Sequence, residues 1–469
     1  MAVGLESRRC DVAVVGAGPG GYVAAIRAAQ LGKRVLLIER RERLGGVCLN
    51  EGCIPSKALI HAADLAWEVR HASAMGIEAD GVRVDVPRLV AWKDGIVERL
   101  TGGVAFLCRK AGVEVVRGEA RLTSARTLVV ETAEAPFGVE FENVILATGS
   151  SPMTVPGFEP DGERIVGPRE ALSPRRIPER LVVIGAGYVG LELGTVYAKL
   201  GSRVTVVEML PELFPALDRD VAKVVERRLK KLKIRLLLGH RAAGFEAGDP
   251  AVVVAAPESG EPVRLEADTV LVATGRVPNS RGIGLEAAGV ATGDRGFVTV
   301  DGRQETNVPG IFAIGDLTGG ALLAHAAYWQ AKTAAEAIAG EPAAFDHASI
   351  PAVIYTDPEV AWAGLGEAAA RAAGHDVAVG TFPMRASGRA MTLGAVDGFV
   401  KVVAERGSGL LLGTVAVGRG VGEIITEAAL ALEMGAHLED VAGTIHPHPT
   451  LSEAFVEAVE AAMGKAVHT

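Results

Sequence analysis

The sequence contains few aromatic residues and few cysteines, and both shortages exclude classes of protein. Only 4% of the 469 residues are aromatic, which argues against a protein that stacks nucleic-acid bases on its rings. A formal net charge of −9 argues against binding to a phosphate backbone. Four cysteines in so long a chain exclude a scaffold built on disulfide bonds. We therefore expect no nucleic-acid partner.

Long hydrophobic runs and an export signal are missing as well. The chain has no stretch of about 18 uncharged apolar residues, so we expect no membrane span. The N-terminal segment leads directly into residues 11–15 and then into glycines, without the apolar stretch and cleavage site of a signal peptide. We therefore expect a cytoplasmic protein, in which thiols stay reduced and a working disulfide is catalytic.

Glycine is abundant, with 58 residues, and some of these glycines belong to a pattern that occurs twice. In each copy an apolar run of four residues leads into glycines, a helical stretch, a second apolar run and a glutamate. The glutamate, Glu39 or Glu208, follows the first glycine by 23 residues in both copies. The glycines at the first, third and sixth positions are Gly16, Gly18 and Gly21 in one copy and Gly185, Gly187 and Gly190 in the other.

Each element of this pattern has a role in binding a dinucleotide. The first glycine permits a tight turn, the second lets the backbone approach a pyrophosphate, and the third lets the helix pack closely on the strand. The helix N-terminus attracts the phosphates, and the glutamate accepts a hydrogen bond from a ribose hydroxyl. A single glycine pattern also fits an ordinary turn, but its repetition with both strands, the helix and the acid favours two binding sites.

A second repeat supports this interpretation. Residues 144–149 and 270–275 are apolar runs that both end in Ala-Thr-Gly. They are either buried strands with glycine turns or places where the backbone, at Gly149 and Gly275, approaches a dinucleotide. No arginine follows Glu208 closely, and a carboxylate there suits a 2′-hydroxyl, so the second copy favours NAD over NADP. Flavin is the candidate for the first copy, because the segment that follows it needs an electron partner.

That segment contains Cys48 and Cys53, which are separated by four residues. In one regular helix this offset rises about 7.5 Å, beyond the usual Cα separation of about 4.4–6.8 Å in a disulfide. A turn at residues 50–52 would bring the sulfurs together. Because Pro55 suits the first turn of a helix, we expect Cys53 at a helix N-terminus, where the dipole favours a thiolate. Lys57 adds positive charge one turn further on.

Other interpretations of the cysteine pair stay open at this point. Half of a zinc site would need a second such pair, which the sequence lacks, so we expect no metal. The two cysteines also fit as small core residues, whereas a structural disulfide does not suit a cytosolic protein. A redox disulfide beside a nucleotide site is the favoured interpretation. Cys10, before a buried strand, and Cys108, in an expected helix, are interpreted as structural.

Six segments together resemble the pyridine nucleotide-disulfide oxidoreductases, from about residue 8 to residue 465. They are residues 16–21, 45–57, 185–194, 273–279, 311–316 and 448–453. The resemblance implies an α/β fold with two Rossmann-like dinucleotide-binding domains and a C-terminal α+β interface domain. The implied domains are the first part of an FAD domain at 1–152, an NAD domain at 153–277, a central domain completing the FAD site at 278–348, and an interface (dimerisation) domain at 349–469.

The resemblance also assigns residues to the two cofactors. For FAD they are Gly16, Gly18, Gly21, Glu39, Lys57, Gly149 and Asp316. For NAD they are Gly185, Gly187, Gly190, Glu208 and Gly275. Lys57 is expected near the flavin ring, paired with Glu192.

A reaction follows from the same resemblance, which is closest to members that oxidise dihydrolipoyl groups with NAD⁺. Cys53 is expected to face the flavin and Cys48 to exchange with the substrate. A dithiol is a poor nucleophile until it is deprotonated, so a base is needed. His448 is the candidate, with Glu453 as its partner, because a carboxylate fixes the imidazole tautomer and raises its basicity.

The resemblance implies partners too. His448 and Glu453 are expected to reach the disulfide of the other subunit, so the chain is expected to form a homodimer. The expected macromolecular partners are the lipoyl domains and the core subunit of a 2-oxoacid dehydrogenase or glycine cleavage complex.

The sequence departs from the family in two places. Tyr328 and Trp329 lie in a segment expected near the flavin edge, where close relatives often have Lys, Glu and Gly. Pro447 stands where a small residue is common, and we interpret the neighbouring His446 as structural or supporting.

Two other functions stay open. One is a flavin disulfide reductase for glutathione disulfide or a metal ion, which Glu208 argues against because such reductases prefer NADPH. The other is a flavin-loaded redox sensor or scaffold without turnover.

Overall fold

The computed structural model describes residues 6–468, and residues 1–5 and 469 lie outside the described part. The chain divides into two compact units, each assembled from distant segments. The first unit consists of the residues up to 59 together with 87–153 and 275–346. The second consists of 60–86, 154–274 and the residues from 347 onwards. The four domain boundaries expected from the sequence stay a prediction.

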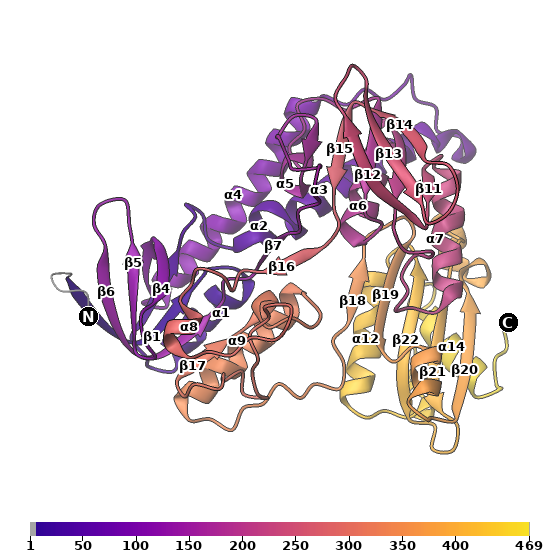
Figure 1. Cartoon of the computed structure of the whole chain (residues 1–469). Coiled ribbons are helices and arrows are strands. Elements are labelled where there is room, and N and C mark those ends of the chain that lie inside the picture. Colours follow the sequence, from indigo (N-terminus) through magenta and orange to yellow (C-terminus); the bar gives the residue numbers. More distant parts are fainter. Residues whose placement is uncertain (1–5, 469) are drawn as a thin grey trace. The chain divides into compact units, whose positions relative to one another are not determined.

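A seven-stranded mixed sheet forms the centre of the first unit (Figure 1). Its strands are β1 (Ser7–Val15), β2 (Val35–Glu39), β3 (Glu114–Arg117), β4 (Glu119–Leu122), β5 (Thr127–Glu131), β6 (Phe137–Leu146) and β17 (Ile311–Ala313). They follow the order β3-β2-β1-β6-β5-β4, and β17 pairs in parallel with the C-terminal half of β6. The strands β3, β2, β1 and β6 are parallel, as expected for a Rossmann-like domain.

Each face of this sheet packs against its own core, because alternate side chains of its strands point to opposite faces. The helices of the unit are α1 (Pro19–Gln30), α2 (Gly46–Glu51), the start of α3 (Cys53–Arg70), α4 (Val86–Lys110), α8 (Leu285–Ala288), α9 (Ala324–Ala339) and the 3-10 turn η2 (Gly315–Leu317). Val12 and Val14 of β1 pack in a core with residues of α1, α4 and α9. Ala13 and Val15 belong to a second core on the opposite face, with β4, β5 and β17.

The second unit contains a parallel sheet in the order β11-β10-β9-β15-β8. Its strands are β8 (Ile165–Val166), β9 (Arg180–Ile184), β10 (Arg203–Val207), β11 (Arg235–Leu237) and β15 (Thr269–Val272). The helices of this part are α5 (Pro168–Ala171), α6 (Tyr188–Leu200) and α7 (Arg219–Lys231), and residues 72–75 form the turn η1 (Ala72–Met75). An antiparallel sheet of β12 (His240–Glu246), β13 (Ala251–Pro257) and β14 (Val263–Ala267) packs on it through Val253 and Val182.

The C-terminal part of the second unit is an antiparallel sheet backed by helices. The sheet has the order β18-β19-β22-β21-β20, with β18 (Ala352–Ile354), β19 (Glu359–Gly364), β20 (Val377–Pro383), β21 (Phe399–Glu405) and β22 (Leu411–Gly418). The helices are α10 (Glu367–Ala372), α11 (Gly388–Thr392), α12 (Val421–Glu433), α13 (Leu438–Ala442) and α14 (Glu453–Ala462), with the turn η3 (Met384–Ala386). Ile425 of α12 and Phe455 of α14 pack in one core with Val402 of β21.

The expected fold class is confirmed, since both glycine patterns lie between a parallel strand and a helix and the C-terminal part is α+β. Two local expectations were wrong. Cys10 lies inside β1 rather than before it, because the strand extends back to Ser7. Asn50 belongs to helix α2 rather than to a turn, because its side-chain amide donates to the carbonyls of Leu44 and Gly46 and holds the helix start. None of the described helices has the length and apolar character needed to cross a bilayer.

Candidate active site

The first glycine pattern forms a tight cradle between β1 and α1. A Cβ atom at Gly16 would lie 2.4 Å from the carbonyl oxygen of Ala147, and one at Gly21 would lie 1.8 Å from that of Gly16. Neither position tolerates a side chain. Gly18, the N-cap of α1, differs because a Cβ there would have no neighbour nearer than 4.0 Å. The open side at Gly18 suits the approach of a pyrophosphate to the helix N-terminus.

The second pattern repeats this geometry in the other unit. A Cβ at Gly185 would lie 2.5 Å from the carbonyl oxygen of Ala273, and one at Gly190 would lie 2.0 Å from that of Gly185. Gly187, the N-cap of α6, has nothing within 4 Å. The alanine of each Ala-Thr-Gly run therefore lies against the first glycine of a pattern, while the approach of Gly149 and Gly275 to a dinucleotide stays a prediction.

The two glutamates that end the patterns are also equivalent. Each carboxylate accepts one N–H from the glycine turn and one from the residue two positions further along the chain. The four hydrogen bonds are Ala17 N–H to Glu39 Oε2 (2.7 Å), Arg41 N–H to Glu39 Oε1 (2.9 Å), Ala186 N–H to Glu208 Oε2 (2.7 Å) and Leu210 N–H to Glu208 Oε1 (2.8 Å). These bonds orient each carboxylate beside its cradle, and the remaining lone pairs can accept ribose hydroxyls.

Asp316 reaches the first cradle through the sheet, because β17 pairs with β6 and the turn η2 follows directly. Its Oδ2 accepts a hydrogen bond from Ser150 Oγ at 2.5 Å. Arg276 donates in turn to Ser150 Oγ at 2.6 Å and lies 3.7 Å from Asp316 Oδ2. Gly149, beside Ser150, has a positive φ of 70° and open space around it. Asp316 thus contacts the residue next to Gly149, and the expected roles of both residues in holding FAD stay a prediction.

The sequence did not predict the hydrogen bonds that join residues 148–151 to residues 276–279. They involve Ser150, Arg276 and Asn279. Asn279 donates to the carbonyl of Thr148 at 2.8 Å and accepts from Ser151 Oγ at 2.7 Å. These contacts join β7 (Ser150–Pro152) to β16 (Arg276–Pro278), a two-stranded antiparallel ribbon in the first unit. The only signal was the position of Arg276 and Asn279 in the segment 273–279.

Cys48 and Cys53 lie on either side of a break between two helices. Cys48 belongs to α2, Gly52 interrupts the helix, and Cys53 is the first residue of α3. This confirms the helix N-terminus expected at Cys53. The side chains of Cys48 and Cys53 are hydrogen-bonded to each other. The redox disulfide stays a prediction, for which this juxtaposition is the structural requirement.

The environment of Cys48 disfavours an isolated thiolate. Its hydrogen bond with Cys53 and its burial raise the pKa of the Cys48 thiol above the ordinary value, while the charge of Lys57 acts in the opposite direction. Burial alone raises the pKa of Cys108 to about 11. Cys10 is buried as well. The burial of Cys108 and Cys10 fits the structural role expected for these two residues.

In the second unit His448 and Glu453 form the expected dyad. His448 Nδ1 lies 2.9 Å from Glu453 Oε1, and the other carboxylate oxygen accepts the Thr450 N–H at 2.7 Å. Burial acts against the carboxylate, but these two bonds hold the pKa of Glu453 below its ordinary value. The His448 side chain is 78% exposed, so its Nε2 is available to a substrate or to a second chain.

Both ring nitrogens of His446 have partners within the second unit. Its side chain is only 6% exposed, its Nε2 lies 2.7 Å from Glu427 Oε1 on α12, and its Nδ1 lies 2.9 Å from the carbonyl oxygen of Thr444. Glu427 was not expected from the sequence, because the pair depends on how α12 packs.

Lys57 and Glu192 belong to different units, and their predicted pairing stays a prediction. Glu192 is buried in α6, where its Oε1 accepts the Tyr355 N–H at 3.0 Å. Lys57 Nζ donates to Ser56 Oγ at 3.4 Å.

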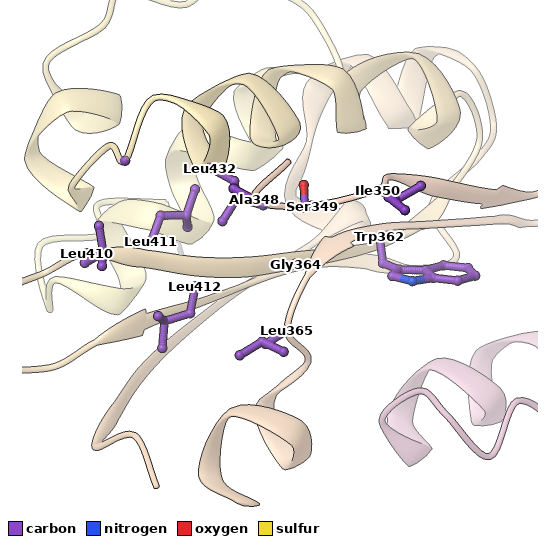
Figure 2. A pocket seen from close by; sticks show the side chains of 11 residues that line it. Ala348, Ser349, Ile350, Trp362, Gly364, Leu365, Leu410, Leu411, Leu412 and Leu432 are labelled. Atoms are coloured by element: carbon purple, nitrogen blue, oxygen red, sulfur yellow. The ribbon is translucent and has the colours of Figure 1, made fainter. Parts of the chain in front are cut away.

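A separate pocket of about 440 Å³ lies in the C-terminal part of the second unit (Figure 2). Leucines 410–412 and Leu432 line it together with Ile350 and Trp362. None of the site residues expected from the sequence lines this pocket. Among the described residues no group of three or more His, Cys, Asp and Glu side chains is placed to hold a metal ion.

Comparison with known families matches residues 10–331 to the pyridine nucleotide-disulphide oxidoreductase model and residues 350–459 to the dimerisation domain of the same family. The chain belongs to the pyridine nucleotide-disulphide oxidoreductases. This oxidoreductase family fits both dinucleotide cradles and the cysteine pair described above, and it makes FAD and NAD the cofactors that the two cradles would hold.

Relatives of this oxidoreductase match it along its full length. A protein of Halobacterium salinarum named dihydrolipoyl dehydrogenase is 49% identical over 100% of this chain and 99% of its own length. Proteins of the same name from Thermus scotoductus and Bacillus subtilis are 48% and 44% identical, over 98% and 100% of this chain and 98% and 99% of their own lengths.

Solved structures share the fold. LpdA from Mycobacterium tuberculosis matches with a TM-score of 0.89 and 30% identity, over 96% of this chain and 99% of that one. The HOCl-induced flavoprotein disulfide reductase RclA from Escherichia coli matches with a TM-score of 0.85 and 25% identity, over 96% and 99%.

Proposed function

We propose that the chain is a dihydrolipoyl dehydrogenase, which oxidises protein-bound dihydrolipoyl groups and reduces NAD⁺ to NADH. The observation that carries the proposal is the hydrogen-bonded pair of Cys48 and Cys53 in the same unit as the first dinucleotide cradle. The full-length similarity to relatives of that name supports the choice of substrate. The overall reaction is dihydrolipoyl protein plus NAD⁺ giving lipoyl protein, NADH and a proton.

The residues divide the reaction between them. His448, oriented by Glu453, takes a proton from one substrate thiol, and the thiolate attacks Cys48 Sγ, breaking its bond to Cys53. Cys53 leaves as a thiolate at the N-terminus of α3. The second substrate thiol then attacks the mixed disulfide, so that the lipoyl disulfide forms and Cys48 departs as a thiol. FAD, when bound, supplies the two-electron carrier between the sulfurs and nicotinamide.

The assigned cofactor residues fit their groups. Gly18 leaves an open approach for the FAD pyrophosphate, and Glu39 presents an oriented carboxylate for its ribose. Gly187 and Glu208 do the same for NAD, with Gly275 following the strand β15. A carboxylate at Glu208 repels a 2′-phosphate, which excludes efficient use of NADP.

We further propose a homodimer in the cytoplasm that serves a 2-oxoacid dehydrogenase or glycine cleavage complex through its lipoyl domains and core subunit. The match of residues 350–459 to a dimerisation domain supports the homodimer. Ile445 is 96% exposed and Met434 75%, and exposed apolar side chains in that domain suit a surface that a second chain covers.

A second candidate is a flavin disulfide reductase with another substrate, which the similarity to RclA favours. A solved structure of that protein is titled as its Cu(II) complex. Steady-state rates separate the candidates: we expect rapid NADH formation from dihydrolipoamide and NAD⁺, little with NADP⁺, and little turnover with glutathione disulfide or Cu(II).

The Cys53→Ser variant tests the cysteine pair itself. We expect it to lose activity by at least about 10³-fold, because no disulfide can form. Cys108→Ala, which alters a buried thiol of the same unit, is the matched control and should keep its activity. Full turnover by Cys53→Ser would overturn the proposal. A wild-type protein that binds FAD but turns over no dithiol would overturn it as well, because that outcome is expected of a redox sensor.

A further inference from the structure

Tyr22 of α1 and Tyr328 of α9 form a pair of phenols that the reaction above does not use. One phenol O–H donates to the other phenol oxygen across 3.2 Å. The two rings meet edge to face, with their centroids 6.1 Å apart. Both side chains are half-buried where α1 packs against α9 in the first unit.

The backbone places this pair beside the cysteine helices. The Gly45 N–H donates to the carbonyl of Ala17 at 2.8 Å, and a Cβ at Gly46 would lie 2.5 Å from the Cα of Gly18. The first turn of α2, which carries Cys48, is therefore pressed against the first turn of α1, which carries Tyr22.

Side-chain packing agrees with this placement. Tyr22 packs on the apolar core that contains Leu49 of α2, and Ile54 of α3 packs on the same core. These two residues directly follow Cys48 and Cys53 in the chain. Tyr22 therefore shares a core with the residues that directly follow the two cysteines, and Tyr328 contacts Tyr22.

The phenols stay neutral in these surroundings. Burial raises the pKa of Tyr328, and its bond to Tyr22 and negative charge on Cys48 and Cys53 raise it further. Burial and charge on Cys48 likewise raise the pKa of Tyr22, although the hydrogen bond acts in the opposite direction. Negative charge on the cysteines therefore raises the pKa of both phenols, and the phenols keep their protons.

The phenol pair has one hydroxyl donor that its internal hydrogen bond does not use. Two phenols carry two O–H groups, and the bond between them uses one. The second O–H remains for another acceptor. A thiolate is such an acceptor, and on Cys48 or Cys53 it arises only when the Cys48–Cys53 disulfide is reduced.

We propose that Tyr328, held in place by Tyr22, is a positioning residue that presents a neutral phenol dipole to the cysteine pair and stabilises its reduced form. The inference rests on the proposed function, because the two cysteines must be a redox couple. In the step concerned a dithiol is oxidised to its disulfide, the Cys48–Cys53 bond breaks, one sulfur leaves as a thiolate and the other as a thiol, and one proton is released.

The test is the redox equilibrium of the cysteines in the FAD-loaded protein. Wild type, Tyr328→Phe, Tyr22→Phe and the double variant are equilibrated with mixtures of dithiothreitol and its cyclic disulfide, quenched in acid and alkylated. Mass spectrometry then counts free Cys48 and Cys53. We expect the equilibrium constant for reduction to fall about 10-fold in Tyr328→Phe, since hydrogen bonds to charged groups have about this effect. A tenfold change corresponds to about 30 mV for a two-electron couple.

Tyr197→Phe is the matched control. It removes the O–H that donates to the carbonyl of Ala171 at 2.7 Å, so it costs stability within the second unit, whereas the cysteines belong to the first. We expect its redox equilibrium to equal that of wild type. We expect Tyr22→Phe to act in the same direction as Tyr328→Phe and the double variant to match Tyr328→Phe alone, as residues acting as one unit do.

Two results have separate meanings. If wild type forms no Cys48–Cys53 disulfide, the proposed function fails. If wild type forms it and Tyr328→Phe equilibrates like Tyr197→Phe, the function stands and the role of Tyr328 is overturned. Should Tyr328→Phe fail to fold, Tyr22→Phe carries the same decision, because a wild-type equilibrium in that variant also overturns the pair.

Discussion

His448 Nδ1 lies 2.9 Å from Glu453 Oε1, and Glu453 itself is anchored by the Thr450 N–H at 2.7 Å. The carboxylate therefore fixes both the ring orientation and the nitrogen that carries a proton. His468 Nδ1 lies 2.7 Å from Glu457 Oε1, and Glu457 belongs to α14 as Glu453 does. The two pairs offer a direct comparison between a dyad in the family's motif and one outside it.

The dyad should be needed for turnover. We expect His448→Gln to lower kcat for dihydrolipoamide oxidation by about 10²–10⁴-fold, the usual contribution of a general base. Glu453→Gln should have a smaller effect of the same sign, because the base remains without its orienting carboxylate. His468→Gln is the matched control, and a loss there as large as in His448→Gln would contradict the assignment.

A mixed dimer tests whether the dyad serves the other subunit. Chains with Cys48→Ser and with His448→Gln should each be inactive as homodimers. A purified heterodimer of the two combines one intact cysteine pair with the dyad of the other chain, so it should recover about half of the wild-type rate if each site is shared. No recovery in the heterodimer would show that the cysteines and the dyad of one chain work together.

Glu208 should set the choice of pyridine nucleotide. Replacing it in the double variant Glu208→Ser/Met209→Arg removes a carboxylate and adds a cation for a 2′-phosphate. We expect the ratio of kcat/KM for NAD⁺ to that for NADP⁺ to fall by about 100-fold or more, since two charged interactions change. Glu212→Ser, a nearby exposed carboxylate, should leave the ratio unchanged, and an unaltered ratio in the double variant would reject the role of Glu208.

The closeness of the first cradle can be tested by adding one methyl group. Gly21→Ala would place a Cβ 1.8 Å from the Gly16 carbonyl oxygen, so we expect loss of FAD and a destabilisation of about 1–3 kcal/mol from overpacking. Gly102→Ala lies in α4 with no atom within 4 Å of the added group and should stabilise by about 0.5–1 kcal/mol. Flavin absorbance and thermal unfolding measure both effects, and normal flavin content in Gly21→Ala would refute the cradle.

A buried cation in the second unit predicts a loss of stability. Lys401 is 6% exposed and its Nζ lies 3.0 Å from Asp218 Oδ2 and 2.5 Å from Asp220 Oδ2. Lys401→Met leaves buried carboxylate charge without its partner and should lower the free energy of unfolding by about 2–4 kcal/mol. Lys231→Met breaks an exposed pair with Asp397 and should cost less than about 1 kcal/mol. Equal effects in urea unfolding would contradict this account.

The same cluster fixes the sign of a pH effect. Burial opposes charge on Asp218, but the Ala368 N–H and Lys401 hold its pKa below the ordinary value. A carboxylate whose pKa is lowered on folding stabilises the folded state at pH values above its unfolded pKa of about 3.9. This stabilisation is lost as the pH falls through the folded-state pKa. We therefore expect unfolding free energy to decline below about pH 4, less steeply in Asp218→Asn. An identical decline in both proteins would rule out this contribution.

The local elements of the site could be predicted from sequence. Gly16, Gly21 and Glu39 lie within one strand-turn-helix-strand unit, so their spacing alone determines that they meet at one strand end. Cys53 was predicted at a helix N-terminus for the same reason, since proline and the cysteine lie in one turn. The family motif that contains His448 and Glu453 spans only six residues, and its internal hydrogen bond formed as expected.

The tertiary structure decided the contacts between distant segments. Asp316 meets Ser150 because β17 adds to β6, and strand order is a property of the whole sheet rather than of either segment. Burial decided that His446 pairs with Glu427. Tyr22 and Tyr328 meet because α1 and α9 pack together, more than 300 residues apart in the chain. Local patterns are set by backbone geometry over a few residues, whereas these pairs depend on which apolar faces the complete fold buries against each other.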